Sequence, residues 1–142
     1  MGNLVSYIAT SPALNIAPTE QYLIIQLDNQ FFAIEAKFII EISNAQTVTP
    51  VPLGPNSIIG LMNFREQVIP VVNIRAKLGL TNKTINDCKS ITMTYEGNAY
   101  TFIVDKVGDL LDLVETEISN GMYTLHNNQV IILSIDTLLA TS

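Results

Sequence analysis

Short apolar runs separated by turn residues recur along the chain, and this pattern predicts strands rather than long helices. Strand-forming residues fill residues 22–27 and 31–36, and the DNQ between them favours a turn, so the two runs predict a hairpin. A second hairpin is predicted where ITMTY alternates, EGN turns and AYTFIVD returns. A third is predicted from GMYTLH and QVIILS, with its turn at Asn127 and Asn128.

The segments between the hairpins carry proline and glycine, which limit what they can form. Residues 47–56 have the sequence TVTPVPLGPN, and their three prolines lack the backbone donor of a central strand, so we expect an exposed or edge connection. QVIPVVNI predicts a strand with Pro70 at an edge or a bulge. KFIIEIS fits both a helical and an extended period, so it predicts either a short helical turn or a strand.

Two brief helices complete the pattern. IRAKLGL predicts a short helix closed by Gly79, and SIDTLLA predicts a terminal helix with Ser134 or Asp136 as its cap. The polar, turn-rich residues 81–90 predict a loop and a seam between two subdomains.

Many short strands with tight turns and brief helices predict a mainly β fold, either one barrel or a pair of small barrels. Residues 1–19 contain two prolines and no clear period, so we expect a flexible lead-in there, followed by a single domain over residues 20–142. A chain of 142 residues is long enough to bury roughly two-thirds of the surface that its unfolded form exposes.

The composition points to a partner. The chain is 48% hydrophobic and only 14% charged, where a soluble domain averages about 25% charged residues. An unusually apolar surface in such a chain marks an interaction site. A formal net charge of −6 argues against binding nucleic acid or anionic membranes. No apolar run approaches the ~20 residues of a spanning helix, so we expect no direct membrane insertion.

Residues that carry chemistry are scarce. His126 and Cys88 are the single histidine and cysteine, too few for the soft ligands of a zinc site, and no nucleophile signature accompanies His126. No glycine-rich nucleotide loop occurs. The remaining group is a run of five carboxylates in thirteen residues: Asp105, Asp109, Asp112, Glu115 and Glu117. Their spacing fits no calcium loop, and the simpler interpretation is the solvated face of a half-buried element. We therefore expect no catalytic residue, no metal and no cofactor, and the default function is binding.

One segment is more specific. GLMNFREQVIPVVNIRAKLGL, residues 60–80, resembles the signature of the CheW-like domain family, which typically reads G-x-x-N-L-R-G-x-x-x-P-V-x-D-L-R-x-x-L-G. Four further stretches resemble the family in the same order along residues 20–140: YLIIQLDNQFFAIEAKFIIEI, TVTPVPLGPNSIIG, YTFIVDKVGDLLDL and VIILSIDTLL. The resemblance implies a fold of two five-stranded β-barrel subdomains packed on a shared core, with short helices.

The resemblance also implies a function. Members of the family are non-enzymatic cytoplasmic adaptors that couple the cytoplasmic tips of methyl-accepting chemoreceptors to a histidine autokinase of the CheA type, at receptor arrays on the membrane. The positions that match the family's contact residues are Ile39, Glu41, Gly60, Asn63 and Arg65. The expected surface is an apolar patch around Ile39 and residues 58–64, with Arg65 and Glu41 at its margin.

Three departures from the family pattern bear on the partners. Glu66 stands where the family has glycine, and a glutamate there would strain the turn if the glycine adopts a positive φ. Asn73 replaces the usual aspartate, which removes a charge beside Arg75. The segment EISNG, residues 117–121, is about a dozen residues shorter than in typical members, in what we expect to be the second barrel.

Alternative interpretations remain open. The chain could serve a type IV pilus (twitching) pathway or another chemosensory pathway rather than flagellar chemotaxis. It could also be a small-ligand binding barrel or a degenerate family member. For the site residues the structural alternative is an exposed Arg65–Glu ion pair worth ~0–1 kcal/mol, a solvent-facing Glu41, a core-packing Ile39 and a tight turn at Gly60.

Overall fold

The computed structural model describes residues 19–51, 57–81 and 87–139, and within them the chain forms two β-sheets. The first sheet has five strands in the order β10 (Met122–Leu125), β11 (Asn128–Leu133), β2 (Gln30–Glu35), β1 (Thr19–Leu27) and β9 (Lys106–Val114). The second has six in the order β3 (Ile39–Asn44), β7 (Lys89–Tyr95), β8 (Asn98–Val104), β6 (Gln67–Val72), β5 (Ile58–Phe64) and β4 (Thr49–Pro50). The lead-in predicted over residues 1–19 lies outside the described residues except for Thr19, which begins β1.

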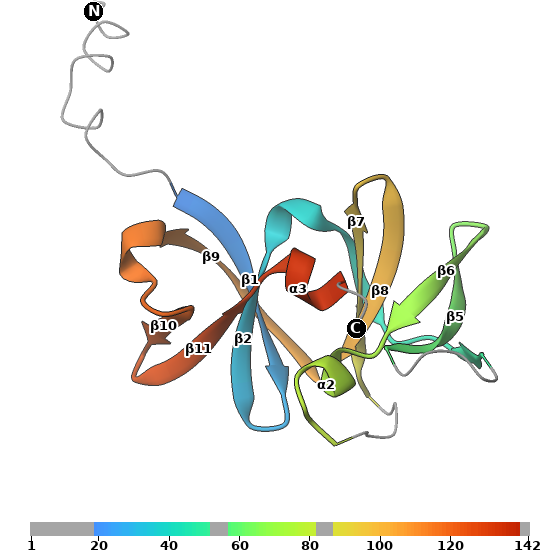
Figure 1. Ribbon diagram of the computed structural model, residues 1–142, viewed down its shortest axis with the longest axis horizontal. Coiled ribbons are helices and arrows are strands. Elements are labelled where there is room, and N and C mark those ends of the chain that lie inside the picture. The colour runs from blue at the N-terminus through green and yellow to red at the C-terminus, as the bar shows by residue number, and fades with distance from the viewer. Residues whose placement is uncertain (1–18, 52–56, 82–86, 140–142) are drawn as a thin grey trace, which may run out of the picture.

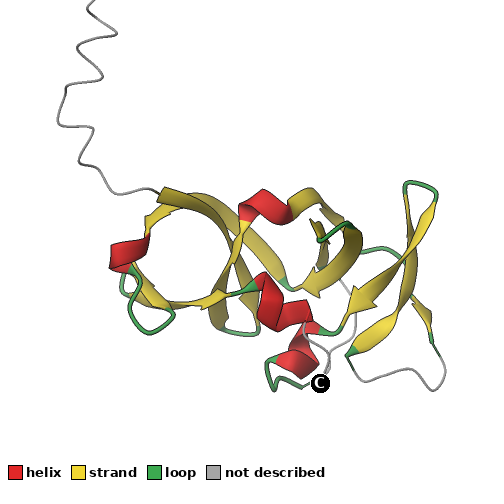
Figure 2. Ribbon diagram, turned by 45° about the horizontal axis from the view of Figure 1, so that its top comes forward, coloured by secondary structure: helices red, strands yellow, loops and turns green. Residues whose placement is uncertain are grey.

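Each sheet curls on itself, so the molecule has two barrel-like halves side by side (Figures 1 and 2). The mainly β fold with two barrel-like subdomains is therefore confirmed. The second half differs from the expected five strands only by β4, which is two residues long. β4 pairs with β5 at the end of the strand order, so Thr49 and Pro50 of the predicted connection lie at a sheet edge, as expected, while its residues 52–56 lie outside the described residues.

The chain passes from one sheet to the other through η2 (Ala36–Phe38), between β2 and β3, and again at Asp105, between β8 and β9. Every strand of the second sheet thus comes from the stretch between these crossings. The seam predicted at residues 81–90 is wrong, because β6 before that segment and β7 after it belong to the same sheet. KFIIEIS forms both of its predicted alternatives in succession, a 3₁₀ turn in η2 and a strand in β3.

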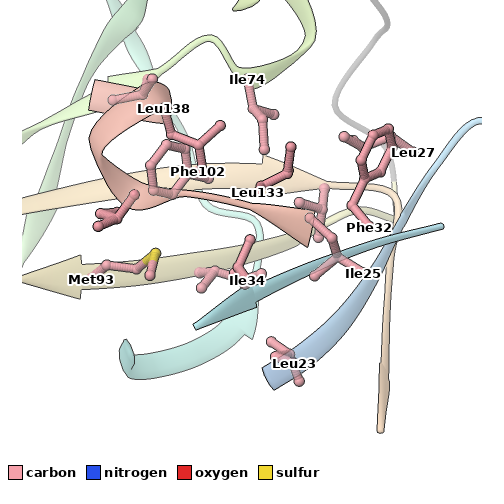
Figure 3. Packing of buried hydrophobic residues seen from close by; sticks show 14 residues of the cluster. Leu23, Ile25, Leu27, Phe32, Ile34, Ile74, Met93, Phe102, Leu133 and Leu138 are labelled. Carbon is pink, nitrogen blue, oxygen red and sulfur yellow. The ribbon is translucent and has the colours of Figure 1, made fainter. Parts of the chain in front are cut away.

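The main core lies between the two sheets, where their facing sides pack together (Figure 3). Leu23, Ile25 and Phe32 come from the first sheet and meet Met93 and Phe102 of the second. These side chains are all at most 2% exposed. Burial of this kind contributes roughly 1.5–3 kcal/mol per side chain, so the shared core holds the two halves together.

Two short helices cover this core, and both lie between the halves in Figure 1. α3 (Ile135–Leu139) inserts Ile135 and Leu138 into the core cluster. α2 (Ile74–Lys77) inserts Ile74, and Gly79 follows the helix with a φ of 74°, as expected for the residue that ends it.

The ends of these helices bear on two sequence expectations. Asn73 caps α2, because its side-chain oxygen accepts a hydrogen bond from the Ala76 N–H at 3.1 Å. The asparagine found there thus performs a structural role that requires no charge. Ser134 directly precedes α3, which is the cap position, whereas Asp136 lies in the first turn and its carboxylate accepts the hydroxyl of Tyr95.

Three hairpins turn through two residues that both have positive φ, which defines the type I′ turn favoured by the twist of β-strands. The central residues are Arg65 (50°) and Glu66 (66°), Glu96 (52°) and Gly97 (83°), and His126 (49°) and Asn127 (68°). The third turn lies one residue earlier than its predicted position at Asn127 and Asn128, because Leu125 pairs directly with Asn128.

Pro70 was expected at an edge or a bulge, but β6 lies inside its sheet, between β8 and β5. Only Val71 and Val72 pair with β8, however, so β6 has a neighbour on one side alone at Pro70. The missing N–H of the proline therefore breaks no strand pairing.

Arg75 on α2 joins the two sheets through ion pairs. Its Nη2 lies 2.5 Å from Asp28 Oδ1, in the turn between β1 and β2, and its Nη1 lies 3.3 Å from Asp105 Oδ1. The Nε donates a hydrogen bond to the Thr81 carbonyl at 2.6 Å, and the Asp28 N–H donates to Asp105 Oδ2 at 2.7 Å. The Arg75 side chain is only 11% exposed. From this buried position it links the turn after β1 with the segment between β8 and β9, which are far apart in sequence.

Candidate functional site

Arg65 lies at the tip of the β5–β6 hairpin, where the two-residue turn projects it from the second sheet. Its Nη2 donates to Glu41 Oε1 at 3.0 Å, and its guanidinium carbon lies 4.8 Å from the centre of the Phe64 ring. Glu41 belongs to β3, which lies at the opposite end of the strand order from β4 and β5. The ion pair therefore bridges the open seam of the curled second sheet.

This ion pair contributes little to stability. The Arg65 side chain is 64% exposed and that of Glu41 is 38% exposed, and solvent-exposed pairs of this kind are worth ~0–1 kcal/mol. Both charges remain accessible to a protein that docks against the seam. The structure thus brings together two of the five site residues predicted from sequence, Arg65 and Glu41.

Ile39 and Glu41 lie on opposite faces of the second sheet, although they are two residues apart. Ile39 pairs with Met93 and Glu41 pairs with Thr92, and the β3–β7 register shifts between them. Paired residues of antiparallel strands point to the same side of a sheet, so Ile39 faces the main core with Met93. Ile39 is half-buried there, in agreement with the core-packing interpretation.

The exposed apolar side chains near the ion pair are not those expected. Met62 and Phe64 of β5 are buried inside the second half, so they are not part of a surface patch. Ile40 and Ile42, which flank Glu41 on β3, are 40% and 43% exposed. The exposed apolar side chains next to Glu41 in sequence are therefore on β3 rather than on β5, and Ile42, which pairs with Ile91, lies on the opposite face of that edge strand from Glu41.

Gly60 is required by a close approach of two strands and not by a tight turn. It pairs with Pro50 of β4, and a Cβ at this position would overlap the Thr49 carbonyl and Val48 Cγ1. Gly60 is buried in β5, and its role in binding a partner stays a prediction.

Asn63 lies on the outer side of the β5–β6 hairpin, opposite Val68, and both side chains are exposed. They border a shallow hollow of about 340 Å³ lined by Thr47, Thr49, Leu61, Met62, Asn63 and Val68. Asn63 thus belongs to a different surface from Ile39, which faces the core on another strand.

Two exposed groups that the sequence analysis did not select are the isoleucine pair Ile40 and Ile42, and Val68, which is 62% exposed. A usable signal was present in both cases. FIIEI and QVI each contain adjacent apolar residues. Adjacent residues on a strand point to opposite faces, so one residue of each adjacent pair must point away from the core.

The acidic run is divided by the fold. Asp109, Asp112, Glu115 and Glu117 are exposed on β9 and η3 (Glu115–Glu117), in agreement with a solvated face. Asp105 differs, because its side chain is only 11% exposed and pairs with Arg75. No group of His, Cys, Asp or Glu within the described ranges is arranged to hold a metal ion.

The single histidine and cysteine do not form a site with each other. His126 is exposed in the β10–β11 turn, and Cys88 is buried next to β7 and forms no disulfide.

The first half contains a hollow of about 390 Å³ lined by Glu20, Tyr22, Glu35, Leu113, Glu115, Ile118, Gly121, Ile132, Leu133 and Ser134. Burial raises the pKa of Tyr22, and the nearby carboxylates of Glu35, Glu20 and Glu115 raise it further. Lys37 lies 3.6 Å from Glu35 and 3.9 Å from Glu20, so two of the three carboxylates already have a cation beside them.

Comparison with known proteins identifies the relatives of the chain. The family model of the CheW-like domain matches residues 21–140. The chain is 27% identical over 109 residues to a chemotaxis protein CheW of Helicobacter pylori, covering 76% of this chain and 66% of that protein. It is 23% identical over 137 residues to a chemotaxis protein CheW of Klebsiella aerogenes, covering 86% of this chain and 82% of that protein.

The same fold occurs in the crystal structure of the scaffolding protein TtCheW from Thermoanaerobacter tengcongensis. It superposes with a TM-score of 0.76 at 18% sequence identity, covering 87% of this chain and 94% of that one. The matched regions span just under two thirds of the length of the Helicobacter pylori and Treponema pallidum relatives, at 66% and 62%. Among the described residues, no helix is long and apolar enough to cross a membrane.

Proposed function

Because this chain belongs to the CheW-like domain family, we propose that it is a non-enzymatic adaptor that couples the cytoplasmic tips of chemoreceptors to a histidine autokinase of the CheA type. It acts in the cytoplasm and is recruited to receptor arrays at the membrane. The observation that supports this best is the exposed Arg65–Glu41 pair, which lies at the seam of the second sheet, on an edge strand that also carries two exposed isoleucines.

The mechanism is docking without chemistry. Ile40 and Ile42 supply apolar area, and the desolvation of such side chains is the main source of affinity in protein interfaces. Arg65 and Glu41 present opposite charges at fixed positions, which orient a partner and reject partners with the wrong charge pattern. The main core keeps the two halves in one arrangement, so the surface is formed before a partner arrives.

Replacing Arg65 tests this surface. Arg65→Glu leaves the fold intact, since the pair that it breaks is exposed, but places a carboxylate opposite Glu41. We expect the dissociation constant for the purified receptor fragment or the kinase to rise at least about tenfold, which corresponds to ~1.4 kcal/mol. Titration calorimetry measures the binding, and circular dichroism verifies the fold.

The charge-reversed pair serves as the control. Arg65→Glu combined with Glu41→Arg restores an ion pair within the chain but reverses the pattern that a partner meets. If Arg65 contacts a partner, binding stays weak in the double variant. Full recovery of binding would show that Arg65 only holds β3 to the hairpin, and would contradict its role in docking.

The short connection between β9 and β10 favours a second candidate within the same class, an adaptor of a type IV pilus or another chemosensory pathway. After η3 the chain turns at once, with Ser119 bridged to Met122. This connection belongs to the first sheet and not to the second barrel, where the sequence analysis expected it. Co-purification from the native host distinguishes the two, because it recovers either pilus regulators or flagellar chemotaxis proteins.

A further inference from the structure

The β5–β6 hairpin carries a residue that its backbone disfavours. In the three type I′ turns the second central residue is Gly97, Asn127 or Glu66, each with a φ between 66° and 83°. Glycine and asparagine are the residues that adopt this conformation readily. A glutamate in it costs stability, and residues held in such conformations concentrate at functional sites. Among these three residues, only Glu66 is of a type that the turn conformation does not favour.

No described residue pairs with the exposed Glu66 carboxylate. Its neighbour Arg65 is already engaged, because the guanidinium lies 3.0 Å from Glu41. The charges of Arg65 and Glu41 offset each other, so the tip of the hairpin keeps one negative charge from Glu66. This charge points to a cationic group on whatever docks there.

An exposed apolar side chain follows Glu66 closely in sequence. Val68 follows Glu66 by two residues and is 62% exposed, the most exposed large apolar side chain of the described residues. It borders the hollow of about 340 Å³ on the outer side of the hairpin, whose lining includes no charged residue. A single apolar side chain of a partner has the size and polarity that this hollow accommodates.

We propose that Glu66, Val68 and this hollow form a docking point for a protein segment that presents a lysine or arginine beside an apolar side chain. The basic group pairs with the Glu66 carboxylate while the apolar side chain covers Val68. This inference rests on the proposed function, because it adds to the adaptor a feature that selects among receptors or kinases. It predicts that Glu66 is retained for binding at the expense of hairpin stability.

The test uses the full chain with two purified probes, the cytoplasmic receptor fragment and the CheA-type kinase of the same organism. Glu66→Gln removes the charge, and Glu66→Gly removes the charge together with the disfavoured conformation. The matched control is Glu96→Gln, which removes an exposed carboxylate from the neighbouring type I′ turn. For the apolar contact, Val68→Ser is compared with Leu110→Ser, whose side chain is 54% exposed on β9 of the other sheet.

We expect Glu66→Gln and Glu66→Gly to weaken binding of one probe about three- to tenfold and to reduce its dependence on salt. Glu66→Gly should do so while its urea unfolding midpoint rises, which separates lost docking from lost folding. Glu96→Gln and Leu110→Ser should stay within twofold of the parent chain.

Each other outcome has a distinct meaning. If the parent chain binds a probe and both Glu66 variants bind it equally well, the docking point is refuted while the adaptor function stands. If the parent chain binds neither probe, the adaptor function fails, and the docking point that rests on it fails too. Equal losses in Glu66→Gln and Glu96→Gln would reveal a general charge effect and overturn the specific role of Glu66.

Discussion

The surrounding backbone constrains two positions of the β5–β6 hairpin, for different reasons. Glu66 adopts a positive φ that a side chain disfavours, and it nevertheless carries a charged one. Gly60 has no such φ, and what it requires is space, because β4 passes directly over its Cα. A larger residue at such a position cannot be accommodated by a change in its own torsion angles. The neighbouring backbone has to move to make room for the Cβ.

Gly60→Ala is therefore expected to destabilise the fold by about 1–3 kcal/mol, the usual penalty for overpacking, with the loss centred on β4. Urea unfolding measures the stability, and hydrogen exchange at Leu61, which pairs with Thr49, reports detachment of β4. Gly108→Ala is the control, since a Cβ there would meet Ile24 at 3.4 Å, an ordinary contact. Equal stability of the two variants would contradict the close-approach explanation.

At the scale of elements, α3 is held by its apolar face and by one polar contact. Ile135 and Leu138 enter the main core, and the Tyr95 hydroxyl at the end of β7 donates to the Asp136 carboxylate. This hydrogen bond raises the pKa of Tyr95 to about 12, with smaller effects of burial and of nearby carboxylates. The contact links the last described helix to a strand of the second sheet.

A tyrosine whose pKa is higher in the folded chain holds its proton more tightly there than when unfolded. Its contribution to stability is complete below pH 10 and is lost as the pH rises toward about 12. We expect stability to fall in this window, and Tyr95→Phe to remove that part of the fall while lowering stability slightly at pH 7. Urea unfolding at several pH values, with tyrosinate absorbance, measures both. An unchanged alkaline profile in Tyr95→Phe would contradict the assignment.

The elements that could be predicted from sequence are those with a local signal. Alternating apolar residues and turn residues predicted the β1–β2, β7–β8 and β10–β11 hairpins but not the β5–β6 hairpin, and Gly79 predicted the end of α2. The third turn was misplaced by one residue because both Asn127 and Asn128 suit a turn, and pairing with Leu125 decides between them. The order of strands within each sheet has no comparable local signal.

The candidate site was predictable only in part, since its geometry depends on non-local pairing. The register shift after Ile39 places Ile39 and Glu41 on opposite faces of the sheet. Such a shift cannot be predicted from an alternating pattern of apolar and polar residues. Asp105 was grouped with the exposed acids because its partner Arg75 lies 30 residues away. The family resemblance placed Arg65 and Glu41 at the margin of one surface, and their ion pair across the seam is visible only in the fold.

At the scale of the whole molecule, the Arg75 cluster complements the apolar core between the halves. One guanidinium holds the turn after β1 and the crossing before β9, so it fixes two loops against α2. A charge this well buried is stabilising only while its acidic partners remain in place, because its desolvation must be offset.

Arg75→Met keeps most of the side-chain volume but removes the ion pair between Arg75 and the buried Asp105. We expect a loss of about 3 kcal/mol in the free energy of unfolding, measured with urea. Arg65→Met is the comparison, since it breaks an exposed Arg–Glu pair and should cost less than about 1 kcal/mol. If both variants lose a similar free energy of unfolding, burial does not make the Arg75 ion pairs more important for stability than the exposed Arg65–Glu41 pair.

The two crossings between the sheets also govern the order in which the chain can fold during synthesis. The second sheet is complete once β8 has left the ribosome, whereas the hairpin of β1 and β2 acquires its neighbours only when β9 and β11 follow. At about 5–20 residues per second, the stretch from Val104 to Leu133 takes roughly 1.5–6 seconds to synthesise. An isolated two-stranded hairpin is marginally stable at best. During translation the apolar side chains of β1 and β2 are therefore shielded from water mainly by the newly formed second sheet. The middle of the chain folds first, and the strands of the first sheet then assemble against it.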